Sequence, residues 1–207
     1  MTLTKNETSI LLNAVRQGIY FALLYAFVAL LCAFSQHFRE KIFHEHGVVE
    51  NIQLSLLLGS GMIFAIHACC HKKWRIVSLL LASCCFLACC RELDKFFDDV
   101  TPLTSWKFGF MFPIAAFAYA IKHLKKTFKT LLKFVTTPSF FMMCSAIMVI
   151  LPIAQYVGHR PFVSAVLGED NLPAIKEFFE ECCEAIGYFM IFVSSIEYCI
   201  NTRTKHQ

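Results

Sequence analysis

The sequence predicts an all-α integral membrane protein, a bundle of six transmembrane helices with short loops, in which residues 1–207 form one polytopic domain. Composition is the first observation behind this prediction. Of the 207 residues, 57% are hydrophobic and 16% are charged, whereas soluble domains carry about 25% charged residues. The second observation is a series of long uncharged intervals, and the third is the gathering of basic residues in alternate loops.

The uncharged intervals set the number and the length of the helices. Three of them, 17–38, 51–71 and 134–159, have about 20 residues or more, the length that a helix needs to cross a hydrocarbon core of about 30 Å. Three others, 76–90, 108–121 and 185–196, are shorter than this. These three can cross only if ionised side chains enter the membrane at their ends.

The distribution of charge predicts the orientation. With six spans and both termini in the cytoplasm, most Lys and Arg residues fall in inner segments and most Asp and Glu residues fall outside. This is the positive-inside pattern. Omitting any one short segment would invert the rest of the chain and put a basic loop outside. We therefore expect six helices in a bacterial cytoplasmic (inner) membrane, with the lipid bilayer as their surroundings.

The expected helices follow in order at about 18–37, 50–70, 75–95, 103–121, 138–157 and 178–200, after a short cytoplasmic lead over 1–17. Gly59, Ser60 and Gly61 in the second helix are small enough to let a neighbouring helix approach closely. Pro152 predicts a kink in the fifth helix, because proline has no N–H to donate. The basic, amphipathic segment 122–134 is expected to lie on anionic lipid between the fourth and fifth helices.

Charged side chains collect at the outer ends of four of these helices. Arg91, Asp94 and Asp98 are spaced to share one face where the third helix ends, and Lys107 lies near the start of the fourth. The sixth helix opens with four glutamates on one face, Glu177, Glu180, Glu181 and Glu184, and the second helix opens with Glu50 and Gln53. A charge in the bilayer core costs about 2.5 kcal/mol or more, so we expect these groups to face inward and pair.

This clustering predicts an acidic polar site at the extracytoplasmic ends of helices 2, 3, 4 and 6. The candidate catalytic residues are Glu50, Arg91, Glu92, Asp94 and Glu184. The candidate substrate-binding residues are Gln53, Lys107, His159, Arg160 and Glu181. Acids outnumber bases there, which favours a cation, a metal or a cationic head group, while Arg91 and Arg160 are suited to an anionic head group such as phosphate. Ion pairs that only fix the tilt and order of the helices are the alternative.

Two kinds of specific chemistry remain open. A divalent metal is a candidate cofactor, with His46 and Asp98 as candidate ligands, although no HExxH or similar spacing occurs. The cysteines include the adjacent pairs Cys89–Cys90 and Cys182–Cys183 near outer helix ends. They form no Cys-x-x-Cys motif, so a thiol relay or a disulfide competes with the role of small hydrophobic residues.

The sequence favours a membrane-embedded enzyme or binding protein that acts on a lipid-linked or envelope substrate. A small cation or proton-coupled transporter is the alternative, in which Glu197 and His67 would pass a proton inward. A non-catalytic assembly or accessory protein is the second alternative. No nucleic acid is expected as a partner, because the net charge of +4 comes from inner-loop anchors rather than from a grooved basic face.

Overall fold

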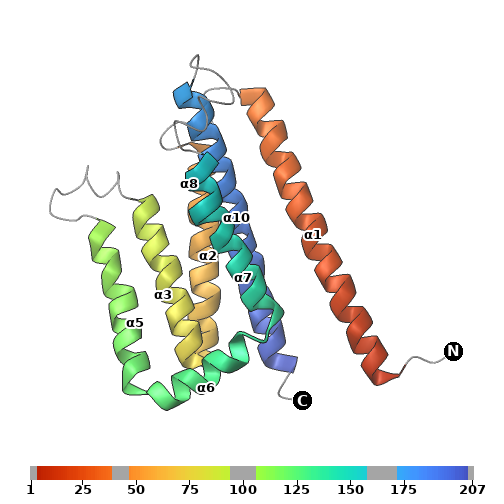
Figure 1. Cartoon of the computed structure of the whole chain (residues 1–207), viewed down its shortest axis with the longest axis vertical. Coiled ribbons are helices and arrows are strands. Elements are labelled where there is room, and N and C mark those ends of the chain that lie inside the picture. Colours follow the sequence, from red (N-terminus) through yellow and green to blue (C-terminus); the bar gives the residue numbers. More distant parts are fainter. Residues whose placement is uncertain (1–3, 39–46, 94–105, 158–171, 205–207) are drawn as a thin grey trace. The chain divides into compact units, whose positions relative to one another are not determined.

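The computed structural model describes residues 4–38, 47–93, 106–157 and 172–204, and nearly all of these residues are helical. Figure 1 gives the course of the chain and the labels of its elements. The chain divides into two compact units, Met1–Ile42 and Phe43–Gln207. The first contains one helix and the second a packed helical bundle.

The first unit is the helix α1, Lys5–Phe38. It begins well before residue 18, where the sequence predicted the span, because Thr4 and Glu7 form a reciprocal cap. The Thr4 backbone N–H donates to Glu7 Oε2 at 2.8 Å, and the Glu7 N–H donates to Thr4 Oγ1 at 3.3 Å, which satisfies amide groups that a helix start leaves open. The Thr4 backbone N–H and the Thr4 hydroxyl both donate to Glu7 Oε2, and these two hydrogen bonds lower the pKa of Glu7 below its usual value.

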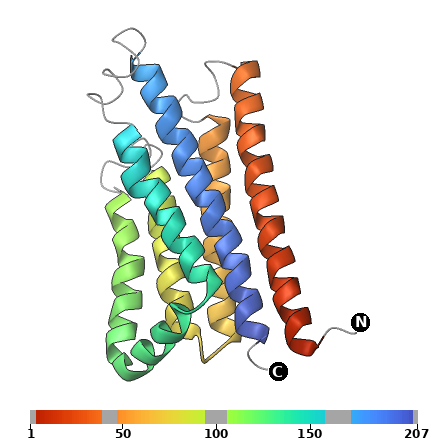
Figure 2. The same cartoon turned by 45° about the vertical axis from the view of Figure 1, so that its right-hand side comes forward.

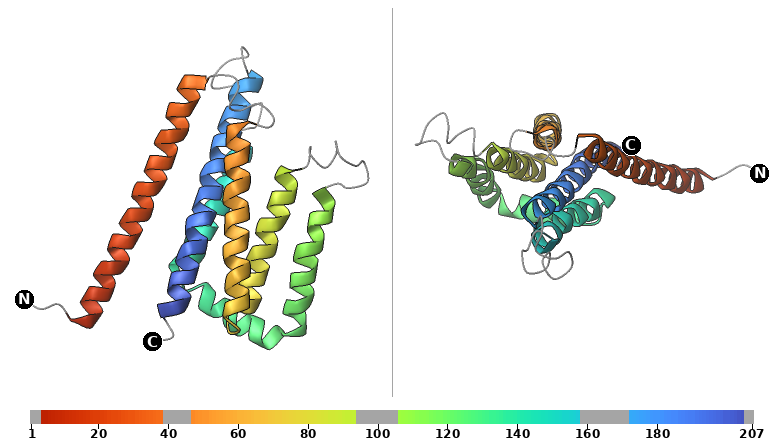
Figure 3. Two further views of the ribbon diagram at one scale, coloured as in Figure 1. Left: turned by 180° about the vertical axis from the view of Figure 1, so that it is seen from behind. Right: turned by 90° about the horizontal axis from the view of Figure 1, so that it is seen from above.

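The second unit is built around three long helices. They are α2, Val48–Cys70, α3, Arg75–Glu92, and α10, Leu172–Thr204. α2 packs against both α3 and α10, and the view from behind in Figure 3 shows α2 and α10 side by side. The shared core includes Leu57, Phe64, Cys85 and Tyr188.

The remaining elements surround these three helices. They are η1, Trp106–Phe110, α5, Met111–Lys122, α6, Leu124–Phe134, α7, Pro138–Met148, η2, Val149–Ile153, and α8, Ala154–Val157. α5 packs against α3, and α7 packs against α10. α6 crosses one end of the bundle and joins α5 to α7, as the two views in Figures 1 and 2 agree.

The predicted close approach at residues 59–61 is confirmed. A Cβ on Gly59 would lie 3.1 Å from the Phe192 ring of α10, and one on Gly61 would lie 2.9 Å from the Phe86 ring of α3. Ser60 between them is fully buried. The segment therefore brings α2 close to two neighbours at once.

The fifth predicted helix is present over the expected range, with a change of form at Pro152. Residues 149–153 make a π-helix between α7 and α8. A proline ring clashes with the carbonyl of the preceding turn and donates no hydrogen bond there, and a wider turn accommodates both effects.

Four helical segments are long and apolar enough to cross a membrane: Ile10–Ala33, Val48–Cys70, Pro138–Tyr156 and Phe178–Arg203. They support an integral membrane protein. Among the described residues, α3 and the pair η1–α5 are not in this set, and their crossing remains a prediction.

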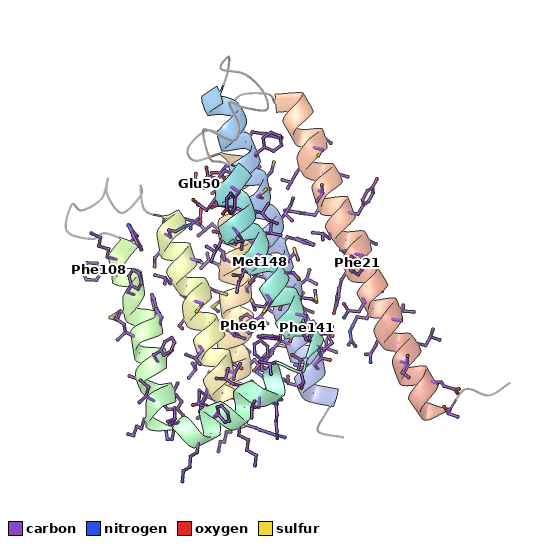
Figure 4. All side chains as sticks on the ribbon, in the orientation of Figure 1. Phe21, Glu50, Phe64, Phe108, Phe141 and Met148 are labelled. Carbon is purple, nitrogen blue, oxygen red and sulfur yellow. The ribbon has the colours of Figure 1, made fainter. Side chains whose placement is uncertain are left out.

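The surface of the helices fits a lipid environment. Phe141 and Met148 are largely exposed, whereas Phe64 is fully buried. Figure 4 labels Phe64, which belongs to α2. Exposed apolar side chains are unfavourable in water, whereas contact with lipid removes this cost.

The contact between α7 and α10 at Gly187 gives a testable prediction. A Cβ on Gly187 would overlap Ile150 and lie 3.2 Å from the Ala146 carbonyl oxygen. Gly187→Ala is therefore expected to lower the free energy of unfolding by about 1–3 kcal/mol, measured by thermal unfolding in detergent micelles. Gly18→Ala is the matched control, since nothing lies within 4 Å of that position. Equal unfolding midpoints for both variants would contradict the close approach.

Candidate functional site

Polar side chains from three helices meet at one end of the second unit, where α2 begins and α3 ends. We call this the acidic end, and its cluster consists of Gln53, Arg91, Glu92, Glu181, Glu184 and Tyr188. Figure 4 labels Glu50 at this end. The helices carry these groups because α3 and α10 each continue past their apolar core into a charged turn.

Arg91 is the centre of the cluster. Its Nη2 donates to Glu184 Oε1 at 2.9 Å and to Glu92 Oε1 at 3.1 Å. The side chain of Arg91 is 43% exposed, whereas those of Glu184 and Glu92 are 9% and 10% exposed. The more accessible cation therefore compensates two carboxylates that are mostly removed from solvent.

Tyr188 completes this group, and sequence reasoning missed it. Its hydroxyl donates to Glu92 Oε1 at 2.7 Å and accepts a hydrogen bond from Arg91 Nη2 at 3.4 Å. Tyr188 lies one turn after Glu184 on α10, and residues four apart share a helix face. That spacing was the available signal, but a tyrosine in an apolar helix more commonly packs in a core.

Gln53 and Glu181 make a second contact at the same end. Gln53 Nε2 donates to Glu181 Oε2 at 2.8 Å and to the Glu181 carbonyl oxygen at 3.1 Å. Both acceptors are oxygens, so the orientation of the amide is determined. Gln53 is 0% exposed, and its Oε1 has no hydrogen-bond partner. A buried acceptor without a donor costs about 1–3 kcal/mol.

The other predicted site residues have different outcomes. Glu50 is partly buried in the first turn of α2, one turn before Gln53. Lys107 is exposed in η1, which packs on α3 where Gly109 approaches Cys90. The structure thus brings together Gln53, Arg91, Glu92, Glu181 and Glu184. Outside the described residues lie His46, Asp94, Asp98, His159 and Arg160.

The described residues contain no group of three or more His, Cys, Asp or Glu side chains placed to hold a metal ion. A metal site that uses His46 or Asp98 remains a prediction. All eleven cysteines are free, including the adjacent pairs Cys89–Cys90 and Cys182–Cys183. Cys89 is buried among core residues, which fits the packing role.

A second polar cluster lies toward the opposite end, within the bundle. We call it the histidine cluster: His67, Ser78, Tyr198 and Thr202, all buried. His67 Nδ1 lies 2.9 Å from Ser78 Oγ, and His67 Nε2 lies 2.7 Å from Thr202 Oγ1. The Tyr198 hydroxyl lies 3.0 Å from Ser78 Oγ. Of these four residues the sequence singled out only His67, because serine and threonine are ordinary helix-packing residues.

The two clusters are separated by an apolar layer. Gln53 and His67 are about 20 Å apart along α2 at the helical rise of 1.5 Å per residue. Leu57, Ala82, Cys85 and Ile191 are buried between the two levels. Among the intervening serines, Ser60, Ser83 and Ser195 each donate to a carbonyl of their own helix. This arrangement closes the acidic end with an apolar floor.

The chain matches no protein-family model, and comparison with curated proteins and with solved structures finds no similar protein. The fold and the contacts described above therefore carry the functional argument.

The ion pair between α3 and α10 gives a prediction about stability. Arg91→Ala leaves two buried carboxylates without their cation, so it is expected to lower the free energy of unfolding by about 1–3 kcal/mol. In a double-mutant cycle with Glu184→Ala, we expect a coupling energy of about 1 kcal/mol or more.

Thermal unfolding of the purified single and double variants measures both quantities. Lys73→Ala, at an exposed position of the turn between α2 and α3, is the control and should change stability by less than about 0.5 kcal/mol. Strictly additive effects of Arg91→Ala and Glu184→Ala would show that the pair does not contribute to the fold.

Proposed function

We propose that this chain is a multi-pass inner-membrane protein whose acidic end binds the head group of a lipid-linked or envelope substrate at the extracytoplasmic surface. The observation that carries the proposal is the fixed cluster of Arg91, Glu184, Glu92 and Tyr188 beside Gln53, whose amide oxygen is buried without a donor. Ionisable groups within membrane spans are rare and are found at binding or reaction sites as well as in ion pairs that order the helices.

Arg91 supplies the part of the site that suits an anion. Its contacts with Glu184, Glu92 and Tyr188 all use Nη2. The side chain remains 43% exposed, so it is accessible from the surface. A planar guanidinium with several donors is well matched to a phosphate group.

Glu181 and Gln53 supply the part that suits a cation. Glu181 precedes Glu184 by three residues on α10, and residues three apart are neighbours on a helix surface. The Glu181 carboxylate and Gln53 Oε1 are hydrogen-bond acceptors, and the free amide oxygen calls for a donor. An ammonium group, which has three N–H donors and no acceptor, meets that requirement. A head group that carries both phosphate and ammonium would use both parts.

The proposal has an enzyme form and a binding form. In the enzyme form, Glu50, Glu92 and Asp94 are the acid and base groups, and Arg91 holds the anionic group of the substrate. In the binding form, the same residues recognise the head group without chemistry. The choice between the two depends on whether the bound head group is altered.

The orientation rests on the charges at the opposite end, which we call the basic end. It holds Lys72, Lys73, Arg75, Lys122, Lys125, Lys126, Lys129, Lys133 and Arg203. Cytoplasmic loops near membrane spans are enriched in Lys and Arg. This pattern supports a cytoplasmic basic end and an acidic end that faces outward.

A proton-coupled or small-cation transporter is the second candidate, and buried Glu197 favours it. Glu197 is 0% exposed and accepts a hydrogen bond from Asn201 at 2.9 Å, within the half of α10 that carries the histidine cluster. The apolar floor below the acidic end weighs against a continuous path. Proton uptake by protein-containing vesicles, abolished by Glu197→Gln but not by Gln53→Leu, would favour the transporter.

Lipid binding to the purified protein tests the proposal. The probes are phosphatidylethanolamine, phosphatidylcholine and phosphatidylglycerol with identical acyl chains, added to the protein in detergent. We expect phosphatidylethanolamine to raise the unfolding temperature most, because only its head group has both a phosphate and an ammonium with N–H donors. Gln53→Leu removes the acceptor and is expected to weaken this binding about 10-fold, the equivalent of one charged hydrogen bond.

Gln155→Leu is the matched control, because Gln155 is exposed in α8. Glu181→Gln provides a second variant that keeps a side chain of the same size if Gln53→Leu fails to fold. Equal effects of the three lipids on the wild-type protein, or unchanged phosphatidylethanolamine binding by folded Gln53→Leu, would reject the proposed site. The cluster would then serve helix packing, as an assembly or accessory protein would require.

A further inference from the structure

The helix α6 at the basic end is divided into three sectors by its sequence. At 3.6 residues per turn, each residue advances about 100° around the helix axis. Thr127, Thr130 and Phe134 share one sector and are all buried. The next sector is apolar and exposed, and the third is basic and exposed. The rest of the helix therefore has two different faces that the protein does not cover.

Contacts from the buried sector and from Lys126 fix the orientation of α6 on the bundle. Thr127 Oγ1 donates to the Ala120 carbonyl of α5 at 2.8 Å. Lys126 Nζ donates to the Lys72 carbonyl, in the turn between α2 and α3, at 3.0 Å. The Phe134 ring packs edge-on against Tyr198 of α10, with centroids 5.6 Å apart. Because α6 contacts three neighbours, its exposed sectors face fixed directions.

The exposed apolar sector continues the exposed apolar surface of α5. Leu124 and Phe128 are each 65% exposed, and the sector is completed by Leu131 and Leu132. Ile121, at the end of α5, is also largely exposed. The exposure of an apolar face of this composition to water would be unfavourable. Its continuity with the exposed apolar surface of α5, a predicted span, favours the acyl region of the bilayer as the layer that covers it.

The basic sector adjoins the apolar one. Lys125, Lys129 and Lys133 are spaced four residues apart and are all exposed. α6 contains no acidic residue. Lysines next to an inserted apolar face can place their ammonium groups at the level of lipid phosphates while their stems remain in the apolar region.

We propose that α6 is a binding surface for anionic phospholipids, with Leu124 and Phe128 in the acyl boundary and Lys125, Lys129 and Lys133 on the head-group phosphates. Charge complementarity and the continuity of the apolar surface identify the occupant. An amphipathic helix gains both apolar burial and electrostatic attraction on such a surface. The proposal concerns the basic end and is independent of the function proposed for the acidic end.

Quenching of tryptophan fluorescence by brominated lipids in reconstituted bilayers tests this surface. The chain has two tryptophans. Trp74 is buried, at 2% exposed, so the reporter is Leu132→Trp, on the exposed apolar sector, in a Trp106→Phe background. Brominated phosphatidylglycerol is expected to quench the Leu132→Trp reporter more than brominated phosphatidylcholine at equal mole fraction. A membrane-adjacent lysine contributes about 1 kcal/mol, or about five-fold in affinity.

The combined variant Lys125→Gln, Lys129→Gln, Lys133→Gln is therefore expected to reduce the preference for phosphatidylglycerol about 100-fold. Lys5→Gln, at the start of α1 in the first unit, is the control for a general loss of positive charge and should leave the preference unchanged. Thermal unfolding of each variant verifies that it is folded. These lysines are exposed, so their replacement leaves the buried sector intact.

Three results would overturn the proposal. One is equal quenching of the Leu132→Trp reporter by the two lipids, and another is an unchanged preference in the folded triple variant. The third is loss of the phosphatidylglycerol preference when inorganic phosphate replaces chloride at equal ionic strength, which would indicate a site for free phosphate. The double variant Leu124→Ser, Phe128→Ser tests the apolar sector separately from the lysines. It is expected to weaken quenching by both lipids, because it removes the side chains proposed to enter the acyl boundary.

Discussion

The ion pair between Arg91 and Glu184 is the interaction on which the arrangement of the second unit depends. α3 has 18 residues, about 27 Å at the helical rise, which is slightly less than the hydrocarbon core of about 30 Å. It can span only if Arg91 reaches the edge of the hydrocarbon. The partner that makes this tolerable is Glu184 of α10, at 2.9 Å, because paired charges cost less in the bilayer than isolated ones.

The two ends of the second unit differ in their chemistry. The acidic end concentrates hydrogen-bond acceptors around one accessible guanidinium, and the buried amide oxygen of Gln53 has no hydrogen-bond donor. The basic end has α6, whose exposed sectors match a membrane surface. The histidine cluster, between these ends, satisfies its polar groups internally. We infer that recognition belongs to the surfaces at the two ends, and that the middle of the bundle provides rigidity.

The sequence predicted the features that depend on charge and length. Uncharged intervals located the helices, and Arg91, Glu92, Glu181 and Glu184 were identified because ionised residues are rare in such helices. Tyr188 was missed because one hydroxyl on an aromatic ring has no compositional signature. The same holds for Ser78 and Thr202, whose role appears only when three helices are packed. The early start of α1 depends on a local cap at Thr4, which hydropathy does not detect, and the π-helix at Pro152 depends on backbone geometry.

The most direct test of this account asks whether α3 crosses the membrane with Arg91 at its edge. Lys73→Cys and Lys107→Cys place single thiols at exposed positions that bracket α3, in a background whose native cysteines are replaced. A membrane-impermeant maleimide is then applied to sealed vesicles of defined orientation. The account predicts that the two positions react from opposite sides of the membrane. Labelling of both from the same side would contradict it, because α3 would not span and the cluster around Arg91 would not lie in the bilayer.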